Sequence, residues 1–235
     1  MAVAFDAAAS LGFTGSNATT ATLAHTISGA NTFLVVYVVS GVNTNDHISG
    51  VTWNGTALVR AKYNVFYNGT NFTHDLWYLR AAETGSHNIV VTNSTDQRNG
   101  IVSMSFTGAA QSGAAQPNGS ARSGNGSNAT SFTHTSTSTI DDCLLVGGMT
   151  PEADRSDMSA ASGSTIRAAS GTFNRAITAD GVLASAGSDT LSATASATGW
   201  GAMSLWVAPV EADAAAPTDI ETINGIASAD IEAVN

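Results

Sequence analysis

Apolar and polar residues follow one another along the chain in the patterns of β-strands. The longest unbroken apolar run is Phe33–Val39, seven residues rich in β-branched and aromatic types. The run is too short for a helix that crosses a membrane, and its composition is typical of a strand covered on both faces. Residues 20–27 alternate instead, with Leu23, His25 and Ile27 on one side, which predicts a half-buried strand. Further strands are predicted at Val3–Phe5, 51–53, 57–59, 87–92 and 101–107, so we expect an all-β fold.

The clearest local signal is a β-hairpin over residues 60–80. Asn68-Gly69 is a pair that a two-residue type I′ turn favours, because both residues can adopt positive φ. With this turn, Lys62, the only lysine in the chain, lies opposite Asp75. We therefore expect an ion pair between Lys62 and Asp75 across the hairpin.

Part of the sequence pattern occurs twice. Gly15–Thr19 reappears as Gly126–Thr130 with the same five residue types. Phe33–Val39 has a weaker echo in Cys143–Met149. Self-similarity at this distance indicates that one structural unit is present in two related copies.

We interpret the copies as two halves of the chain, about 15–107 and 126–208. Residues 108–130 are mostly small and polar, which predicts a long connection. Each half has too few predicted strands to cover its own central strand, so we expect the halves to close one antiparallel, jelly-roll-like β-sandwich over residues 1–209. Two separate immunoglobulin-sized domains are the alternative.

The composition changes after Pro209. Residues 210–218 form an acidic and alanine-rich linker, and the pattern Asp219–Asn224 recurs eleven residues later as Asp230–Asn235. An extended tail of this length has no room for a core, so its regularly placed aliphatic residues can be buried only against another chain. The predicted docking residues are Ile220, Ile223, Ile226, Ile231 and Val234.

Charge excludes several classes of partner. Only 11% of residues are charged and the formal net charge is -10. Binding to phosphates needs clustered Lys and Arg, so neither nucleic acid nor an anionic membrane is an expected partner. The single cysteine, Cys143, lies in a predicted strand and is interpreted as a buried thiol.

Motifs with known chemistry are missing from the sequence. It contains no nucleophile elbow, phosphate-binding loop or zinc-ligand spacing. His25 and His134 hold equivalent places in the two halves, which favours hydrogen-bonded scaffold residues over catalysts. The acids near residues 141–157 are interpreted as a solvated loop and not as a calcium site. We predict no catalytic residue, metal or cofactor.

Aromatic residues supply the remaining candidate for recognition. Four of them cluster in or beside the predicted hairpin: Trp53, Phe66, Tyr67 and Trp77. Sugars stack on exposed aromatic rings that have Asn and Asp nearby, so this cluster is a candidate surface for a glycan or another partner. The alternative is that a second sheet or a neighbouring subunit covers it.

Several segments together resemble a known type of module. They are Ala21–Thr26, Phe33–Val36, Val51–Leu58, Leu76–Leu79, Ile101–Phe106 and Ser204–Val207. They are similar to the jelly-roll, concanavalin-like sandwich of tailed-phage virion proteins and bacterial surface proteins. The tail, with its Ile223-Asn224-Gly225-Ile226 motif, is similar to short repeats that end many phage virion proteins.

The resemblance implies a non-enzymatic structural protein of a tailed-phage virion, either a head decoration or a tail-associated protein. Its partners would be other virion subunits in a homo-oligomer or lattice, and its location would be the virion. The N-terminal residues lack the pattern of a secretory signal, which suits assembly in the cytoplasm. The alternative is a carbohydrate-binding or adhesion module of a secreted bacterial surface protein.

Overall fold

The computed structural model describes residues 2–14, 17–41, 46–67, 71–112, 122–152, 155–171, 174–210, 222–223 and 226–227. These residues form antiparallel strands and no helix, so the expected all-β fold is confirmed. The first half contains β1 (Ala4–Leu11), β2 (Ala18–Ile27), β3 (Phe33–Gly41), β4 (Ile48–Trp53), β5 (Thr56–Ala57), β6 (Val59–Tyr67), β7 (Asn71–Arg80) and β8 (Gly85–Thr107). The second half contains β9 (Arg122–Thr137), β10 (Leu144–Pro151), β11 (Ser159–Ala160), β12 (Ser164–Ser170), β13 (Asn174–Ala179) and β14 (Ser188–Val207).

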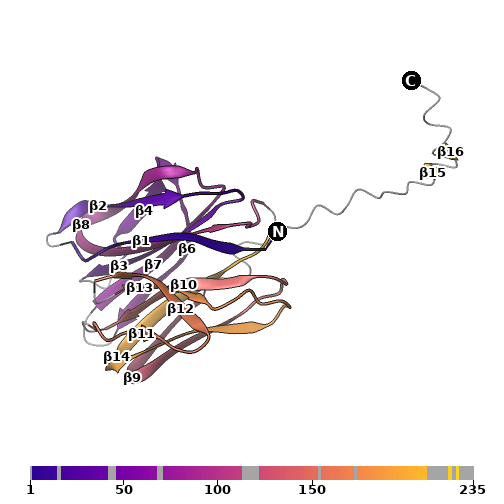
Figure 1. Cartoon of the computed structure of the whole chain (residues 1–235). Coiled ribbons are helices and arrows are strands. Elements are labelled where there is room, and N and C mark those ends of the chain that lie inside the picture. Colours follow the sequence, from indigo (N-terminus) through magenta and orange to yellow (C-terminus); the bar gives the residue numbers. More distant parts are fainter. Residues whose placement is uncertain are drawn as a thin grey trace.

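One long strand in each half takes part in two layers (Figure 1). The first part of β8 pairs with β2 and β4, and its last part pairs with β1 and β3. In the second half, β14 pairs with β9 along most of its length and with β10 at its C-terminal end. Each half is therefore a small sandwich, and the inner layers that contain β3 and β10 face each other.

The two halves share one strand order, except that the first half has an additional edge strand, β5. The order is β5-β4-β8-β3-β7-β6 in the first half and β11-β14-β10-β13-β12 in the second, with β8 matching β14 and β3 matching β10. The expected antiparallel β-sandwich architecture is confirmed. Each half encloses a hydrophobic cluster of its own and a third cluster lies between them, so the halves do not close a single two-layer sandwich. The connection between the halves is shorter than expected, because β9 already begins at Arg122.

The pairing registers correct the sequence alignment of the halves by one residue. Val38 lies opposite Asp75 on β7 and Ile101 on β8, and Met149 lies opposite Arg175 on β13 and Ala202 on β14. Gly100–Phe106 and Gly201–Val207 are similar in sequence, so Val38 corresponds to Met149. Phe33 therefore corresponds to Leu144 and not to Cys143. A shift of one residue would turn each side chain to the opposite face of the strand.

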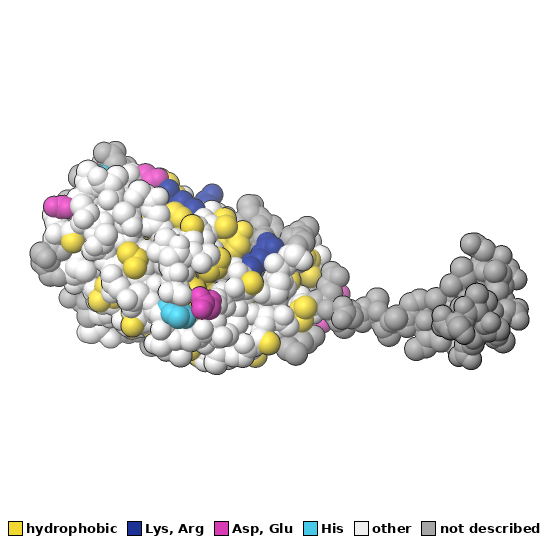
Figure 2. Space-filling model, turned by 90° about the horizontal axis from the view of Figure 1, so that it is seen from above, with side chains coloured by type: hydrophobic (Ala, Val, Ile, Leu, Met, Phe, Trp, Pro, Cys, Tyr) yellow, Lys and Arg dark blue, Asp and Glu magenta, His cyan; other side chains and the backbone are white. Residues whose placement is uncertain are grey.

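Few charged side chains lie on the face of the molecule in Figure 2, and most of it is backbone and uncharged polar side chains. This agrees with the low fraction of charged residues in the sequence. Among the described residues, the large hydrophobic side chains that are exposed to solvent are Val59 and Val182. The described part of the body thus buries nearly all of its large apolar side chains within the chain.

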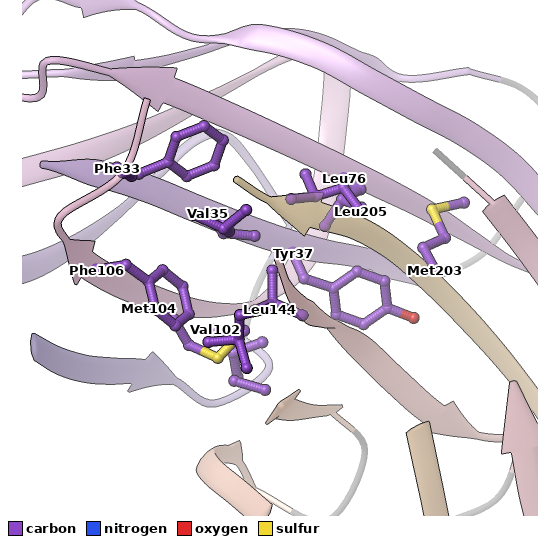
Figure 3. Close-up of a cluster of buried hydrophobic side chains, with 14 of the residues drawn as sticks. Phe33, Val35, Tyr37, Leu76, Val102, Met104, Phe106, Leu144, Met203 and Leu205 are labelled. Atoms are coloured by element: carbon purple, nitrogen blue, oxygen red, sulfur yellow. The ribbon is translucent and has the colours of Figure 1, made fainter. Parts of the chain in front are cut away.

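Three hydrophobic clusters hold the layers together. One lies inside each half, with Trp53 and Ile89 in the first and Phe132 and Trp206 in the second. The third lies between the halves and is shown in Figure 3. It contains Phe33, Val35, Tyr37, Leu76, Val102, Met104 and Phe106 of the first half and Leu144, Met203 and Leu205 of the second. The β3 run is apolar throughout because it contributes to two clusters at once.

The hairpin of β6 and β7 has a different register from the predicted one. Tyr63, not Lys62, lies opposite Asp75, and a bulge between Arg60 and Lys62 restores the predicted pairing of Arg60 with Trp77. The two-residue turn assumed for the prediction does not fit these pairs. The predicted ion pair between Lys62 and Asp75 was wrong, because the shifted register places Asp75 on the buried face beside Arg60.

The described part of the tail forms only a short hairpin. β15 (Thr222–Ile223) pairs with β16 (Ile226–Ala227), and these strands make a two-stranded sheet separate from both larger sheets. Three predicted docking residues, Ile220, Ile231 and Val234, lie outside the described residues. Ile223 and Ile226 lie opposite each other in the hairpin.

Candidate functional site

Two of the four residues of the candidate aromatic surface are buried. Trp53 and Trp77 are 0% and 6% exposed and belong to the cluster inside the first half. The indole of Trp53 donates to the Glu83 carbonyl at 3.0 Å, so it is held inside the sandwich. Trp53 lies on β4 of the outer layer and Trp77 on β7 of the inner layer, and both rings belong to the cluster inside the first half. The side chains of Phe66 and Tyr67 lie outside the described residues.

The two equivalent histidines are scaffold residues, as predicted. His25 lies 3.0 Å from the Ser103 hydroxyl and 3.1 Å from that of Ser105, and it is 3% exposed. His134 makes the matching bond to Ser204 at 2.9 Å. Burial lowers the pKa of His25 to about 4, so its imidazole is neutral at pH 7.

The His25 network does not have the geometry of a catalytic triad. In a triad the acid orients the histidine, whereas here Asp6 accepts a hydrogen bond from Ser105 at 2.7 Å. Both serine hydroxyls near His25 belong to buried residues, and each lies within hydrogen-bond distance of the imidazole. The network joins β1, β2 and β8 and stabilises the first sandwich.

The acids of the second half bind loop backbone. Asp157 accepts from the backbone N–H of Ser196 at 2.7 Å, and Asp141 accepts from Ala186 at 2.6 Å. Across the described ranges, no three His, Cys, Asp or Glu side chains are grouped as a metal would require. Cys143 is buried as predicted, and burial raises the pKa of its thiol.

A buried hydrogen-bond network joins the two halves. The Tyr37 hydroxyl lies 2.5 Å from His74 Nδ1 and 2.9 Å from the Thr150 hydroxyl of the second half. Thr150 donates to Asn174 at 3.2 Å, and the Asn174 amide donates to the Gly100 carbonyl of the first half at 2.8 Å. Burial lowers the pKa of His74 to about 3 and raises that of Tyr37, so the network is neutral at pH 7.

Reciprocal contacts surround this network. The ring of His74 on β7 packs over Gly201 of the second half, where an added Cβ would lie 2.6 Å from it. Asn174 on β13, the counterpart of His74, packs over Gly100 in the same way, at 2.8 Å. In each half, therefore, a polar side chain packs against a glycine of the other half. Such reciprocal contacts are expected where approximate twofold symmetry relates two similar units.

A charged cluster lies at one end of the first half. Arg60 donates through Nε to Asp75 at 2.5 Å and binds both carboxylate oxygens of Asp46 at 2.6 Å. Side-chain exposure is 0% for Asp75, 26% for Arg60 and 43% for Asp46, so Arg60 connects a buried carboxyl with a surface one. The guanidinium also lies 4.7 Å from the ring of Tyr63. The sequence did not predict this cluster, because the expected hairpin register gave Lys62 as the partner of Asp75 and Asp46 lies outside the hairpin.

The buried carboxyl should make stability depend on pH. Burial raises the pKa of Asp75 to about 7, although Arg60 lowers it. The folded state therefore holds the Asp75 proton more tightly than the unfolded state, and this contribution is lost as the pH rises from about 4 to 7. We expect the free energy of unfolding to fall by about 2–4 kcal/mol between pH 4 and pH 8 through this group.

Urea denaturation at a series of pH values would measure this dependence. Buried His25 and His74 have lowered pKa values and contribute a slope of opposite sign up to about pH 6.5, but they do so equally in wild type and in the Asp75→Asn variant. The contribution of Asp75 is therefore the difference between the two proteins, and the stability of wild type relative to Asp75→Asn should fall as the pH rises from 5 to 8. Asp6 and Asp46 have lowered pKa values, so their contributions are lost only below about pH 4 and leave this window unaffected. An identical slope in wild type and Asp75→Asn would contradict the assignment.

None of the described residues forms a helix long and apolar enough to span a bilayer. Comparison of the chain with models of protein families, with curated proteins and with solved structures finds no match.

Proposed function

We propose that the chain is a non-enzymatic structural protein of a tailed-phage virion, in which the β body is displayed and the C-terminal tail binds a neighbouring subunit. The observation that carries the proposal is the contrast between body and tail. The described body packs its apolar faces into three internal clusters. The described tail residues pair only with each other, in a separate hairpin.

The spacing of aliphatic residues in the tail supports docking. Five Ile and Val residues recur at positions 220, 223, 226, 231 and 234, within an acidic segment that has no Lys or Arg. Burial of one such side chain stabilises a contact by about 1.5–3 kcal/mol. Several weak contacts of this kind hold a subunit firmly when many copies bind one lattice. The body, with few exposed large apolar groups, would stay soluble at the particle surface.

Deletion of residues 218–235 should abolish incorporation into particles and leave the body folded. Particles purified from cells that produce the truncated chain would be probed for it by immunoblot, and circular dichroism of the isolated chain would check folding. Ile223→Asn with Ile226→Asn should reproduce the loss, because docking needs apolar side chains. Ser228→Asn is the matched control and should be incorporated normally. Normal incorporation of the truncated chain would refute the proposal.

A further inference from the structure

Buried polar atoms without a partner gather at the charged end of the first half. Within the described residues they include Thr73 Oγ1, Asp75 Oδ2, Asn93 Oδ1 and Asn99 Nδ2. These four residues are at most 5% exposed. An unsatisfied buried polar group costs about 1–3 kcal/mol, and folded proteins leave few of them. The indole nitrogen of the neighbouring Trp77 is also buried and has no hydrogen-bond partner.

Strand pairing places these groups together. Ser40 on β3 lies opposite Thr73 on β7 and opposite Asn99 on β8, so the three form a row across the sheet. Asp75 is two residues from Thr73 and therefore points to the same face. On the covering layer, Asn93 lies opposite Ile48, which contributes to the cluster inside the sandwich. We call Thr73, Asp75, Asn93 and Asn99 the Asp75 end.

The second half serves as an internal control for the Asp75 end. In the matching row, Pro151 replaces Ser40 and Trp200 replaces Asn99. Trp200 stacks on Phe132, with 5.8 Å between ring centroids, so an aromatic pair takes the place of the Asn99 amide. Arg175 replaces Asp75, and its guanidinium donates to the carbonyls of Gly171, Asn174 and Arg155. The shared fold therefore does not require the polar groups of the Asp75 end.

We propose that the Asp75 end is a binding site for hydroxyl groups, supplied by water molecules or by a saccharide. Its free atoms are both acceptors, at Asp75 and Asn93, and donors, at Asn99 and Trp77, and the Thr73 hydroxyl can act as either. A hydroxyl group satisfies both kinds because it donates and accepts. A cation would meet the guanidinium of Arg60, and an anion would meet the carboxyl of Asp75. Buried water fills such positions in many proteins.

The ion pair of Arg60 and Asp46 is the part of this charged cluster that reaches the surface. Asp75 has no exposed side-chain surface, and Arg60 lies between it and the more exposed Asp46. Since Arg60 occupies one carboxylate oxygen of Asp75, the other oxygen, Oδ2, is the one left for a ligand. Thr73, two residues from Asp75 on the same face of β7, also has no partner for its hydroxyl.

A high-resolution crystal structure of the full chain, alone and soaked with glucose, galactose or N-acetylglucosamine, would test the proposal. We expect an oxygen within hydrogen-bond distance of at least two of Thr73 Oγ1, Asp75 Oδ2 and Asn99 Nδ2. A water molecule at this position in both the unsoaked and the soaked crystals would show that the site binds water. A saccharide hydroxyl at this position in the soaked crystals would show that it binds a glycan. Side chains that pair with one another, with no oxygen between them, would overturn the proposal.

The indole N–H signal of Trp77 in NMR spectra gives a solution test. The Thr73→Val, Asn99→Leu variant removes two of the unpaired polar atoms and should lose the nuclear Overhauser effects between this N–H and water or sugar. If the wild type binds a saccharide, the dissociation constant of the variant should rise at least tenfold. Thr135→Val, which removes an exposed hydroxyl pair in the second half, is the control and should change neither readout. Effects that persist in the double variant would overturn the proposal.

Discussion

An alanine at Gly148 should destabilise the whole chain by about 3 kcal/mol. A Cβ added at this position would lie 2.1 Å from Cδ1 of Tyr37, far inside van der Waals contact. The ring cannot move away cheaply, because Tyr37 is 1% exposed and its hydroxyl is bound by His74 and Thr150. Substitution therefore pushes the inner layers of the two halves apart. Chemical denaturation followed by tryptophan fluorescence would measure the loss.

Two further variants separate this effect from a general cost of losing glycine. Gly181→Ala should be nearly neutral, because no atom lies within 4 Å of a Cβ added there. Tyr37→Leu should recover part of the loss when it is combined with Gly148→Ala, since the smaller side chain makes room. Strict additivity of the two substitutions would show that they do not act at one contact and would contradict this explanation.

The sequence predicts much of the fold because its strands are locally encoded. The apolar run Phe33–Val39 is covered on both faces as expected, and residues 20–27 alternate between buried and exposed positions. Duplication was visible in the sequence as well. These signals depend only on the types of residues and on the spacing of apolar positions within a short stretch of the sequence.

The registers could not be predicted from the same signals. The bulge between Arg60 and Lys62 shifts the hairpin by one residue, and no Gly or Pro marks it in the sequence. The burial of Trp53 and Trp77 depends on a covering layer that includes β2, which is distant in the sequence. Which aromatic face remains exposed is thus a property of the assembled sandwich.

The candidate site was predicted in part. Asp75 was expected to have a cationic partner across the hairpin, and it has one, but the partner is Arg60. The unpaired buried atoms became recognisable only when the second half could be compared position by position. That comparison needs the registers and cannot be made from the sequence echo, which is displaced by one residue.

Replacement of Arg60 by Met should destabilise the protein by about 3–5 kcal/mol at pH 8. The substitution keeps most of the packing volume but leaves the carboxylate of Asp75 buried without its counter-charge. The contact with Asp46 adds little to this loss, because that carboxylate is 43% exposed on its side chain. Arg98→Met, at an exposed position, is the control and should cost less than about 1 kcal/mol.

The loss caused by Arg60→Met should depend on pH in a defined direction. Without Arg60 the pKa of Asp75 rises above about 7, its value beside the guanidinium, so the carboxyl is neutral at pH 5 and needs no counter-charge. The difference from wild type should therefore shrink as the pH falls from 8 to 5. Adding Asp75→Asn should restore most of the stability at pH 8, since an amide is neutral at every pH. A deficit that stays constant from pH 5 to pH 8 would mean that Arg60 acts through packing on Tyr63 and Trp77, and not through the charge of Asp75.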